Sequence, residues 1–129
     1  MAAAPPRMTR GEFRQLVLRA LDELPQQFRD ALHNIDIQVR WRPTPTELRA
    51  ARVRPGGDLF GVYLGIPLPR RSHWDSLVPP DVIIIYQRPH ELRCRTEEEM
   101  VQQARKTLLH EIGHYLGISE KRLRELGVG

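Results

Sequence analysis

The sequence predicts a single domain of the α+β class, and three observations support this prediction. A chain of 129 residues has the size of one domain with one modest core. Two segments, one near the N-terminus and one from about residue 97 to 116, repeat apolar residues at the spacing of amphipathic helices. Three short runs between them, at 35–41, 59–66 and 81–86, are rich in β-branched and aromatic residues, as strands are.

The first helix is expected to begin at a capping box. Thr9 is placed to act as the N-cap and Glu12 as the N3 residue that reaches back to it. Pro25 ends or kinks this helix, and a short helical piece is expected at 26–33, which ends in a surface His33. The apolar residues that recur at spacings of three and four are Phe13, Leu16, Val17, Ala20, Leu21 and Leu24.

The three candidate strands differ in their patterns. Residues 35–41 alternate apolar and polar side chains, which predicts a half-buried strand. Residues 59–66 contain Gly61 and Gly65, which indicate a bulge or a close backbone approach. Residues 81–86 are apolar on both faces, so this strand should be central or covered.

The connections between these strands are expected to be irregular. We predict a helical turn at 46–52, a tight turn at 54–58, a long loop at 67–80 and a returning loop at 87–95.

The last long helix should start at a second capping box, Thr96 with Glu99, and continue to about Leu116. Gly117 is suited to close it in the left-handed conformation, and Ser119 to cap a final helix at 120–126. The stripe expected in the core consists of Val101, Ala104, Leu108, Leu109, Ile112, Tyr115 and Leu116. A different stripe, predicted to face a cleft, consists of Gln103, Thr107, His110 and His114.

The segment His110-Glu111-Ile112-Gly113-His114 has the pattern H-E-x-x-H. Histidines four apart lie on one face of a helix, so His110 and His114 can direct two imidazoles at one zinc ion. Glu111 lies where a metalloprotease keeps its general base, and Glu120 follows as a candidate third ligand. With the glycine and the acid included, this pattern arises by chance on the order of once in ten thousand such chains, which favours a metal site over a surface helix with two solvated histidines.

Composition and charge limit the possible partners. The net charge is +4, but 18 of the 20 basic residues are arginines spread along the chain without aromatic platforms, so we expect no nucleic-acid partner. No segment has the length and hydropathy of a membrane span, and the N-terminus does not have the pattern of a signal peptide, so we expect a cytoplasmic protein. Cys94 is the only cysteine and is expected to be a bystander in a loop.

From about residue 10 onward the chain resembles the small bacterial zincin-like metallopeptidase domains. The resemblance rests on HEIGHYLGISE at 110–120 and, more weakly, on LFGVYLGIPL at 59–68 and IIIYQRP at 83–89. It implies a zincin-like α+β fold, with a small mixed β-sheet packed on an N-terminal helix and a C-terminal active-site helix. Residues 1–8 would be a flexible N-terminus and 9–129 the single domain.

The same resemblance assigns roles to the motif residues. It implies that His110 and His114 bind Zn²⁺, that Glu111 is the base, and that Glu120 stands where the family usually has Asp. The favoured hypothesis is therefore zinc-dependent hydrolysis of a peptide or protein, with an extended substrate added to the sheet at 59–66 or 81–86.

The sequence does not identify the group that would stabilise the oxyanion. Only nine residues follow Glu120, and none of them is Tyr, His or a Met that could form a Met-turn. The two arginines among them are not assigned the role of oxyanion donor. Tyr63, Tyr86 and His73 are the upstream candidates. The alternative hypothesis is a catalytically weak or inactive binding or regulatory module with a low-affinity metal site.

Overall fold

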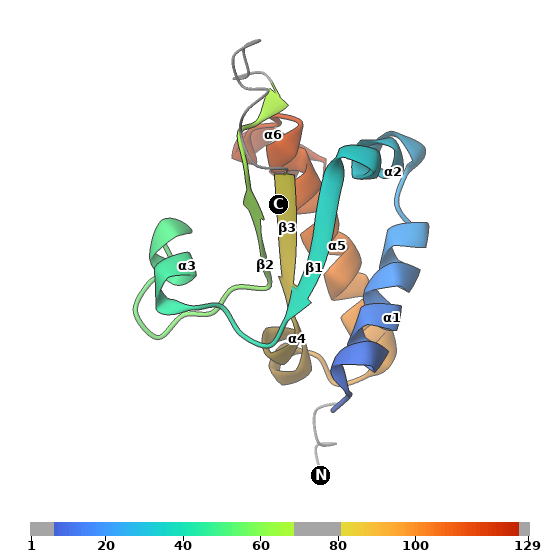
Figure 1. Cartoon of the computed structure of the whole chain (residues 1–129), viewed down its shortest axis with the longest axis vertical. Coiled ribbons are helices and arrows are strands. Elements are labelled where there is room, and N and C mark those ends of the chain that lie inside the picture. Colours follow the sequence, from blue (N-terminus) through green and yellow to red (C-terminus); the bar gives the residue numbers. More distant parts are fainter. Residues whose placement is uncertain (1–6, 69–80, 127–129) are drawn as a thin grey trace.

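The computed structural model describes residues 7–68 and 81–126, which form a three-stranded mixed sheet with helices around it (Figure 1). The strand order is β1-β3-β2. The central β3 (Asp81–Tyr86) runs parallel to β1 (Ile35–Arg40) and antiparallel to β2 (Gly61–Leu64). The predicted α+β class with a small mixed sheet and a central third strand is confirmed.

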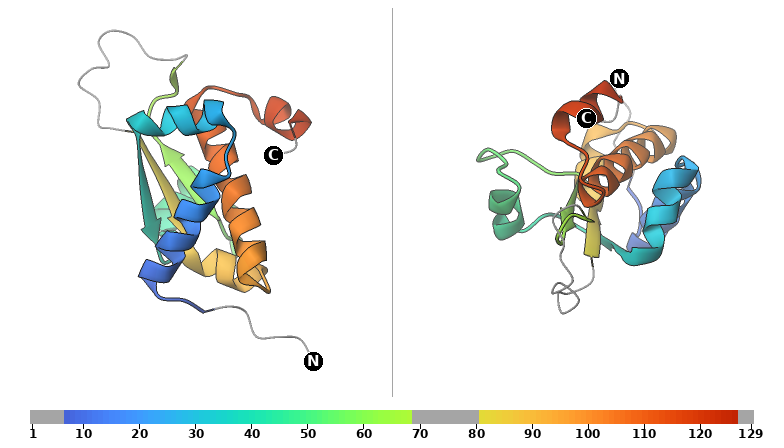
Figure 2. Two further views of the ribbon diagram at one scale, coloured as in Figure 1. Left: turned by 90° about the vertical axis from the view of Figure 1, so that its right-hand side faces the viewer. Right: turned by 90° about the horizontal axis from the view of Figure 1, so that it is seen from above.

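Two helices cover one face of the sheet, as Figure 2 shows. They are α1 (Arg10–Asp22) and α5 (Glu97–Tyr115), which pack against each other, while α5 also contacts β2 and β3. The arrangement of an N-terminal and a C-terminal helix on the sheet is the one expected. Fully or almost fully buried residues of this core include Phe13, Leu16, Val17, Ala20, Ile83, Ile85, Val101, Ala104, Leu108 and Ile112.

The long helices begin where the capping residues predict. Thr9 Oγ1 accepts a hydrogen bond from Glu12 N–H, and the Glu12 carboxylate accepts one from Thr9 N–H at 2.9 Å. At α5, Thr96 Oγ1 accepts from Glu99 N–H at 3.1 Å, but the Glu99 carboxylate accepts from Arg95 N–H at 2.7 Å instead of from Thr96. The second capping box is therefore half formed, with its reciprocal bond shifted by one residue.

The shorter elements differ in extent from the prediction. The segment at 26–33 forms α2 (Gln26–Ala31) followed by a 3₁₀ turn, η1 (Leu32–Asn34). The helical turn is α3 (Pro45–Ala50), and it has its own capping box formed by Thr44 and Glu47. α3 lies on the β2 side of the sheet, away from α1 and α5 (Figure 1).

The loop predicted at 87–95 is wrong in its first seven residues, which form α4 (Gln87–Arg93). Its inward face is polar rather than apolar, with Gln87, His90 and Glu91 all buried, and this polarity conceals a helix from an analysis of hydrophobic spacing. Cys94 caps the end of α4 and is also buried. Burial, with a smaller contribution from Glu99, raises the pKa of its thiol above the usual range, which does not favour a reactive thiolate.

Several buried polar groups of α4 form hydrogen bonds with neighbouring backbone and side chains. The Glu91 carboxylate accepts from Gln87 Nε2 at 2.9 Å and from Met8 N–H at 3.2 Å, and it pairs with Arg88 at 3.2 Å. His90 lies between the rings of Phe13 and Phe60, with centroids 5.3 and 5.0 Å from its own. These contacts fix α4 at the end of β3, opposite the end that carries Asp81.

No helix among residues 7–68 and 81–126 has the length and hydropathy needed to cross a membrane.

The buried His90 should make the stability of the protein depend on pH. Burial lowers the pKa of His90 to about 4 from its usual 6.5, although its Nδ1 hydrogen bond to Tyr86 O at 2.7 Å partly opposes this. The pKa of His90 is lower in the folded protein than in the unfolded chain. The contribution of the neutral His90 to stability is therefore complete above pH 6.5 and is lost as the pH falls toward 4. Between pH 7 and 5, the loss from this residue should be about 2 kcal/mol.

Chemical denaturation of the wild type and of His90→Leu at pH 7 and 5 measures this effect. The free energy of unfolding of the wild type minus that of His90→Leu should be about 2 kcal/mol smaller at pH 5 than at pH 7. A difference that does not change with pH would show that His90 is protonated to the same extent in the folded and unfolded states.

Gly61 is required where β2 passes over α5. A Cβ at this position would lie 2.8 Å from Thr107 Cγ2 and 2.9 Å from Ile84 O, a backbone atom that cannot turn aside. We expect Gly61→Ala to lower the free energy of unfolding by about 1–3 kcal/mol in denaturant titrations. Gly11→Ala is the matched control, because its Cβ would meet only Thr9 Oγ1 at 3.9 Å. Equal stability of the two variants would contradict the close approach.

Candidate metal centre

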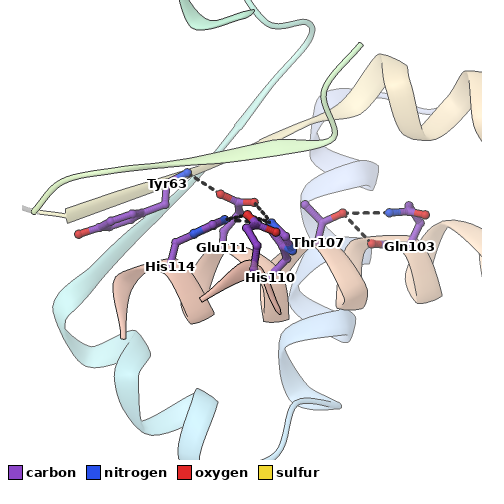
Figure 3. Close-up of polar contacts among 7 residues, drawn as sticks. Tyr63, Gln103, Thr107, His110, Glu111 and His114 are labelled. Atoms are coloured by element: carbon purple, nitrogen blue, oxygen red, sulfur yellow. Dashed lines mark hydrogen bonds and ion pairs between the residues drawn. The ribbon is translucent and has the colours of Figure 1, made fainter. Parts of the chain in front are cut away.

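The last turns of α5 bring two histidine rings together, as Figure 3 shows. His110 and His114 lie one turn apart on the same face of the helix. Their Nε2 atoms are 2.9 Å apart, and the ring planes meet at 76° with centroids 4.6 Å apart. Burial, together with the neighbouring His110, lowers the pKa of His114, which favours the neutral imidazole that a metal ion needs.

The end of α5 turns the chain back toward these rings. Gly117 has a φ of +79°, the left-handed conformation predicted for it. Ile118 N–H donates to Gly113 O at 2.8 Å and Gly117 N–H to His114 O at 3.0 Å, the bond pair of a Schellman motif. Ser119 then caps α6 (Glu120–Glu125), because its Oγ accepts from Arg122 N–H at 3.1 Å. The chain therefore reverses within a few residues and places Glu120 at the start of the new helix.

Gly113 allows α6 to pack closely against α5. A Cβ at Gly113 would lie 2.5 Å from Leu123 Cδ2, and Leu123 is itself fully buried. This glycine lies between the two histidines in the H-E-x-x-H segment, at a position that the motif leaves undefined. No pattern in the sequence indicates its role, because the partner that needs the space is Leu123, on the next helix.

Glu120 reaches both histidine rings from α6. Its Oε1 lies 2.9 Å from His114 Nε2 and 3.3 Å from His110 Nε2. The side chain of Glu120 is 55% exposed, whereas that of His110 is 24% exposed. The three candidate ligands from the sequence are therefore brought together, at the boundary between the protein and solvent.

Glu111 lies on the other side of the histidines, under the sheet. Its Oε1 accepts a hydrogen bond from the backbone N–H of Tyr63 at 2.9 Å, and its Oε2 lies 3.9 Å from His110 Nε2 (Figure 3). Only 11% of its side chain is exposed. Burial raises the pKa of Glu111 to about 8, the Tyr63 bond opposes this rise, and the charge of Glu120 adds to it.

Two carboxylates are thus near the histidines, and their contacts distinguish them. His110, Glu111 and His114 form a group whose candidate ligand atoms lie within 4.8 Å of one another. The Glu120 oxygen is nevertheless closer to both Nε2 atoms than Glu111 Oε2 is to His110, and one Glu111 oxygen is bound to the sheet. The geometry therefore favours Glu120 as the third ligand and leaves Glu111 beside the metal position.

The backbone of β2 faces this centre. Phe60 O accepts from Tyr86 N–H at 2.9 Å, so the backbone groups of Phe60 and alternate residues point toward β3. Those of Gly61 and Tyr63 then point away from the sheet, which agrees with the bond from Tyr63 N–H to Glu111. A cleft of about 470 Å³ lies along this side and is lined by residues of β2, the end of α3, and the side chains of His110, Glu111, His114 and Glu120.

The three candidates for an oxyanion donor are placed differently. The hydroxyl of Tyr63 donates to Asp81 Oδ1 at 2.6 Å, and its ring packs edge-on against Tyr115. Tyr86 is fully buried at the other end of β3, where burial and Glu47 raise its pKa above the usual range. His73 lies outside the described residues.

The donor set suits zinc. Two imidazole nitrogens and one carboxylate oxygen are the protein ligands of one common class of catalytic zinc site, which leaves a further position for water or substrate. The convergence of His110, His114 and Glu120 within 3.3 Å of one another is the observation that supports this match. Sulfur ligands are not needed, which agrees with a buried Cys94 that is not part of the group.

Comparisons with known proteins give a family and a similar fold. The family described as zincin-like metallopeptidase matches residues 32–129. Among solved structures, a conserved hypothetical protein from Thermus thermophilus has a similar fold, with a TM-score of 0.55 and 24% identity over 88% of this chain and 99% of that chain. A search of curated proteins gave no match.

Removal of the Glu120 carboxylate should weaken zinc binding. We expect Glu120→Ala to raise the dissociation constant for zinc by at least about tenfold, since even groups that only orient ligands contribute this much. Competition with a chromogenic chelator measures the constant. Glu125→Ala is the matched control, because Glu125 lies on the same helix and pairs only with Arg122 among the contacts described. Equal affinities for the two variants would exclude Glu120 as a ligand.

Proposed function

Because the chain belongs to the family of zincin-like metallopeptidases, we propose that it hydrolyses peptide bonds at a zinc ion bound by His110, His114 and Glu120. The observation that carries this proposal is the meeting of three ligand side chains from two helices beside a buried carboxylate.

Glu111 is the general base in this proposal. When bound, zinc supplies a Lewis acid that lowers the pKa of a water molecule to about 7 and polarises a carbonyl. Glu111 Oε1 stays on Tyr63 N–H, so the carboxylate is oriented, and Oε2 on the histidine side accepts the proton of the attacking water. The same oxygen then delivers that proton to the amine that leaves.

The substrate would bind along β2. Strand β3 pairs with β1 on one side and β2 on the other, so the alternative of substrate addition at 81–86 is wrong. The outward backbone groups of β2 lie next to the histidines and can receive an extended peptide as a further strand. Because Tyr63 N–H is occupied by Glu111, that peptide would use the remaining outward groups, such as those of Gly61.

A second candidate function is a binding or regulatory module with a low-affinity metal site. One observation favours it: the hydroxyl of Tyr63 is bound to Asp81, and Tyr86 is buried away from the cleft. Neither of these two tyrosines is then directed at a developing oxyanion. Stoichiometric zinc together with no turnover of any peptide in a broad library would favour this module over the peptidase.

Replacement of Glu111 by Gln tests the proposed mechanism. The amide keeps the shape of the side chain but cannot accept the proton of water, so kcat/KM should fall by at least about 10²-fold. Zinc content should remain one ion per chain, because the three ligands are unchanged. Peptide hydrolysis and atomic absorption give the two values. Glu97→Gln, an exposed residue in the first turn of the same helix, is the control and should retain full activity.

A Glu111→Gln variant that kept wild-type turnover would overturn the role of Glu111 as base. A variant that lost zinc as well would instead make Glu111 a ligand.

A further inference from the structure

A second cavity lies beside the metal centre, along α5 toward its N-terminus. It has a volume of about 310 Å³ and shares His110 and Glu111 with the larger cleft. Leu59, Phe60 and Gly61 form one wall at the start of β2, and Gln103, Lys106 and Thr107 form the α5 side. A side chain next to the bond that is cleaved would therefore find this cavity within reach.

The floor of the cavity needs no polar partner from a ligand. Thr107 Oγ1 donates to Gln103 O at 2.8 Å and accepts from Gln103 Nε2 at 3.2 Å (Figure 3). The hydroxyl is therefore satisfied within its own helix. The wall formed by Leu59 and Phe60 is apolar, so the body of the cavity suits the aliphatic part of a side chain.

Lys106 supplies a positive charge at the outer end. It is exposed and forms no ion pair with any residue in the described ranges. The two acids about two turns before Lys106 on the same helix are engaged elsewhere: Glu98 pairs with Arg19 at 3.5 Å, and Glu99 accepts from Arg95 N–H at 2.7 Å. The ammonium is thus available to a ligand, and Glu111 at the inner end is the one acid among the residues that line the cavity.

We infer that this cavity binds a substrate side chain that ends in a carboxylate, with Lys106 as the residue that determines the specificity. The inference rests on the proposed peptidase function. Lys106 and His110 are four residues apart, which corresponds to about 6 Å along the helix. A substrate Glu next to the cleaved bond can extend over this distance with its methylenes on the apolar wall and its charge at Lys106. Asp is one methylene shorter and should bind less well.

A carboxylate can also come from the C-terminus of a peptide. In that case the protein would remove residues from peptide ends instead of cutting inside them. Peptides with amidated and free C-termini distinguish the two sources, because an amidated peptide with an internal Glu retains only the side-chain carboxylate.

The test uses the zinc-loaded full chain and fluorogenic peptides with Glu, Asp, Gln or Lys on either side of the cleaved bond. The wild type should cleave the Glu peptide with a kcat/KM about two- to fivefold above that of the Gln peptide, the range expected for an exposed ion pair. Lys106→Met should remove this preference, and Lys106→Glu should reverse it in favour of Lys. High salt should reduce the preference in the wild type.

Arg14→Glu is the control for the change in charge. Arg14 is exposed on α1, and its replacement alters the net charge as much as Lys106→Glu does. Its preference for Glu should equal that of the wild type. If Arg14→Glu reversed the preference as well, the overall charge of the protein and not the cavity would be responsible.

Binding to Glu111→Gln separates this inference from the peptidase proposal. The anisotropy of labelled Glu and Gln peptides reports binding without turnover. A tighter complex with the Glu peptide that is lost in Lys106→Met supports the cavity even if no peptide is cleaved. Cleavage or binding that does not distinguish Glu from Gln would overturn the inference and leave the peptidase function intact. A preference for free C-termini alone would also overturn it, because the cavity would then bind the terminal carboxylate of a peptide and not a side chain.

Discussion

The hydrogen bond from the backbone of Tyr63 to the carboxylate of Glu111 is the contact on which the centre depends. It joins the edge strand β2 to the helix that carries both histidines. A bond to a charged acceptor contributes about 1.5–3 kcal/mol, but burial raises the pKa of Glu111 to about 8, so one bond does not offset the cost of removing this charge from water. Gly61 makes the contact possible, because a larger residue would hold the strand away from Thr107. The site therefore buries a carboxyl group whose charged form is disfavoured, at some cost to stability, as functional sites commonly do.

The tyrosine side chains of β2 and β3 stabilise the fold, whereas the backbone of β2 contacts the metal centre. The hydroxyl of Tyr63 binds Asp81, which ties β2 to the first residue of β3, while the amide of the same residue orients Glu111. Tyr86 ends β3 in a fully buried position. Tyrosine side chains are the oxyanion donors that the sequence suggests. The contribution of β2 to the centre is instead a backbone N–H, a group that every residue except proline possesses.

Local rules predicted much of this architecture from the sequence, and the remainder depends on contacts between distant residues. The caps at Thr9 and Ser119, the left-handed Gly117 and the apolar stripe of α5 follow from spacing within one helix, so they could be predicted. The helix α4 could not, because its buried face is polar, and its Gln87 and Glu91 bond the backbone of Met8, about 80 positions earlier in the chain. The same limit applies to Gly113, whose need for space comes from α6.

The centre consists of two parts of unequal stability, which are joined by the packing of Leu123 on Gly113. Both histidines lie on a helix of 19 residues that is buried in the core, whereas Glu120 lies on a helix of 6 residues held by one buried leucine and the turn before it. Opening of α6 alone should cost less free energy than unfolding of the core, and it would remove one proposed ligand while the other two stay in place. If zinc binds as proposed, its occupancy and the docking of α6 are linked equilibria, so each stabilises the other. Local unfolding of α6 would then release the ion while the sheet and its two covering helices stay intact.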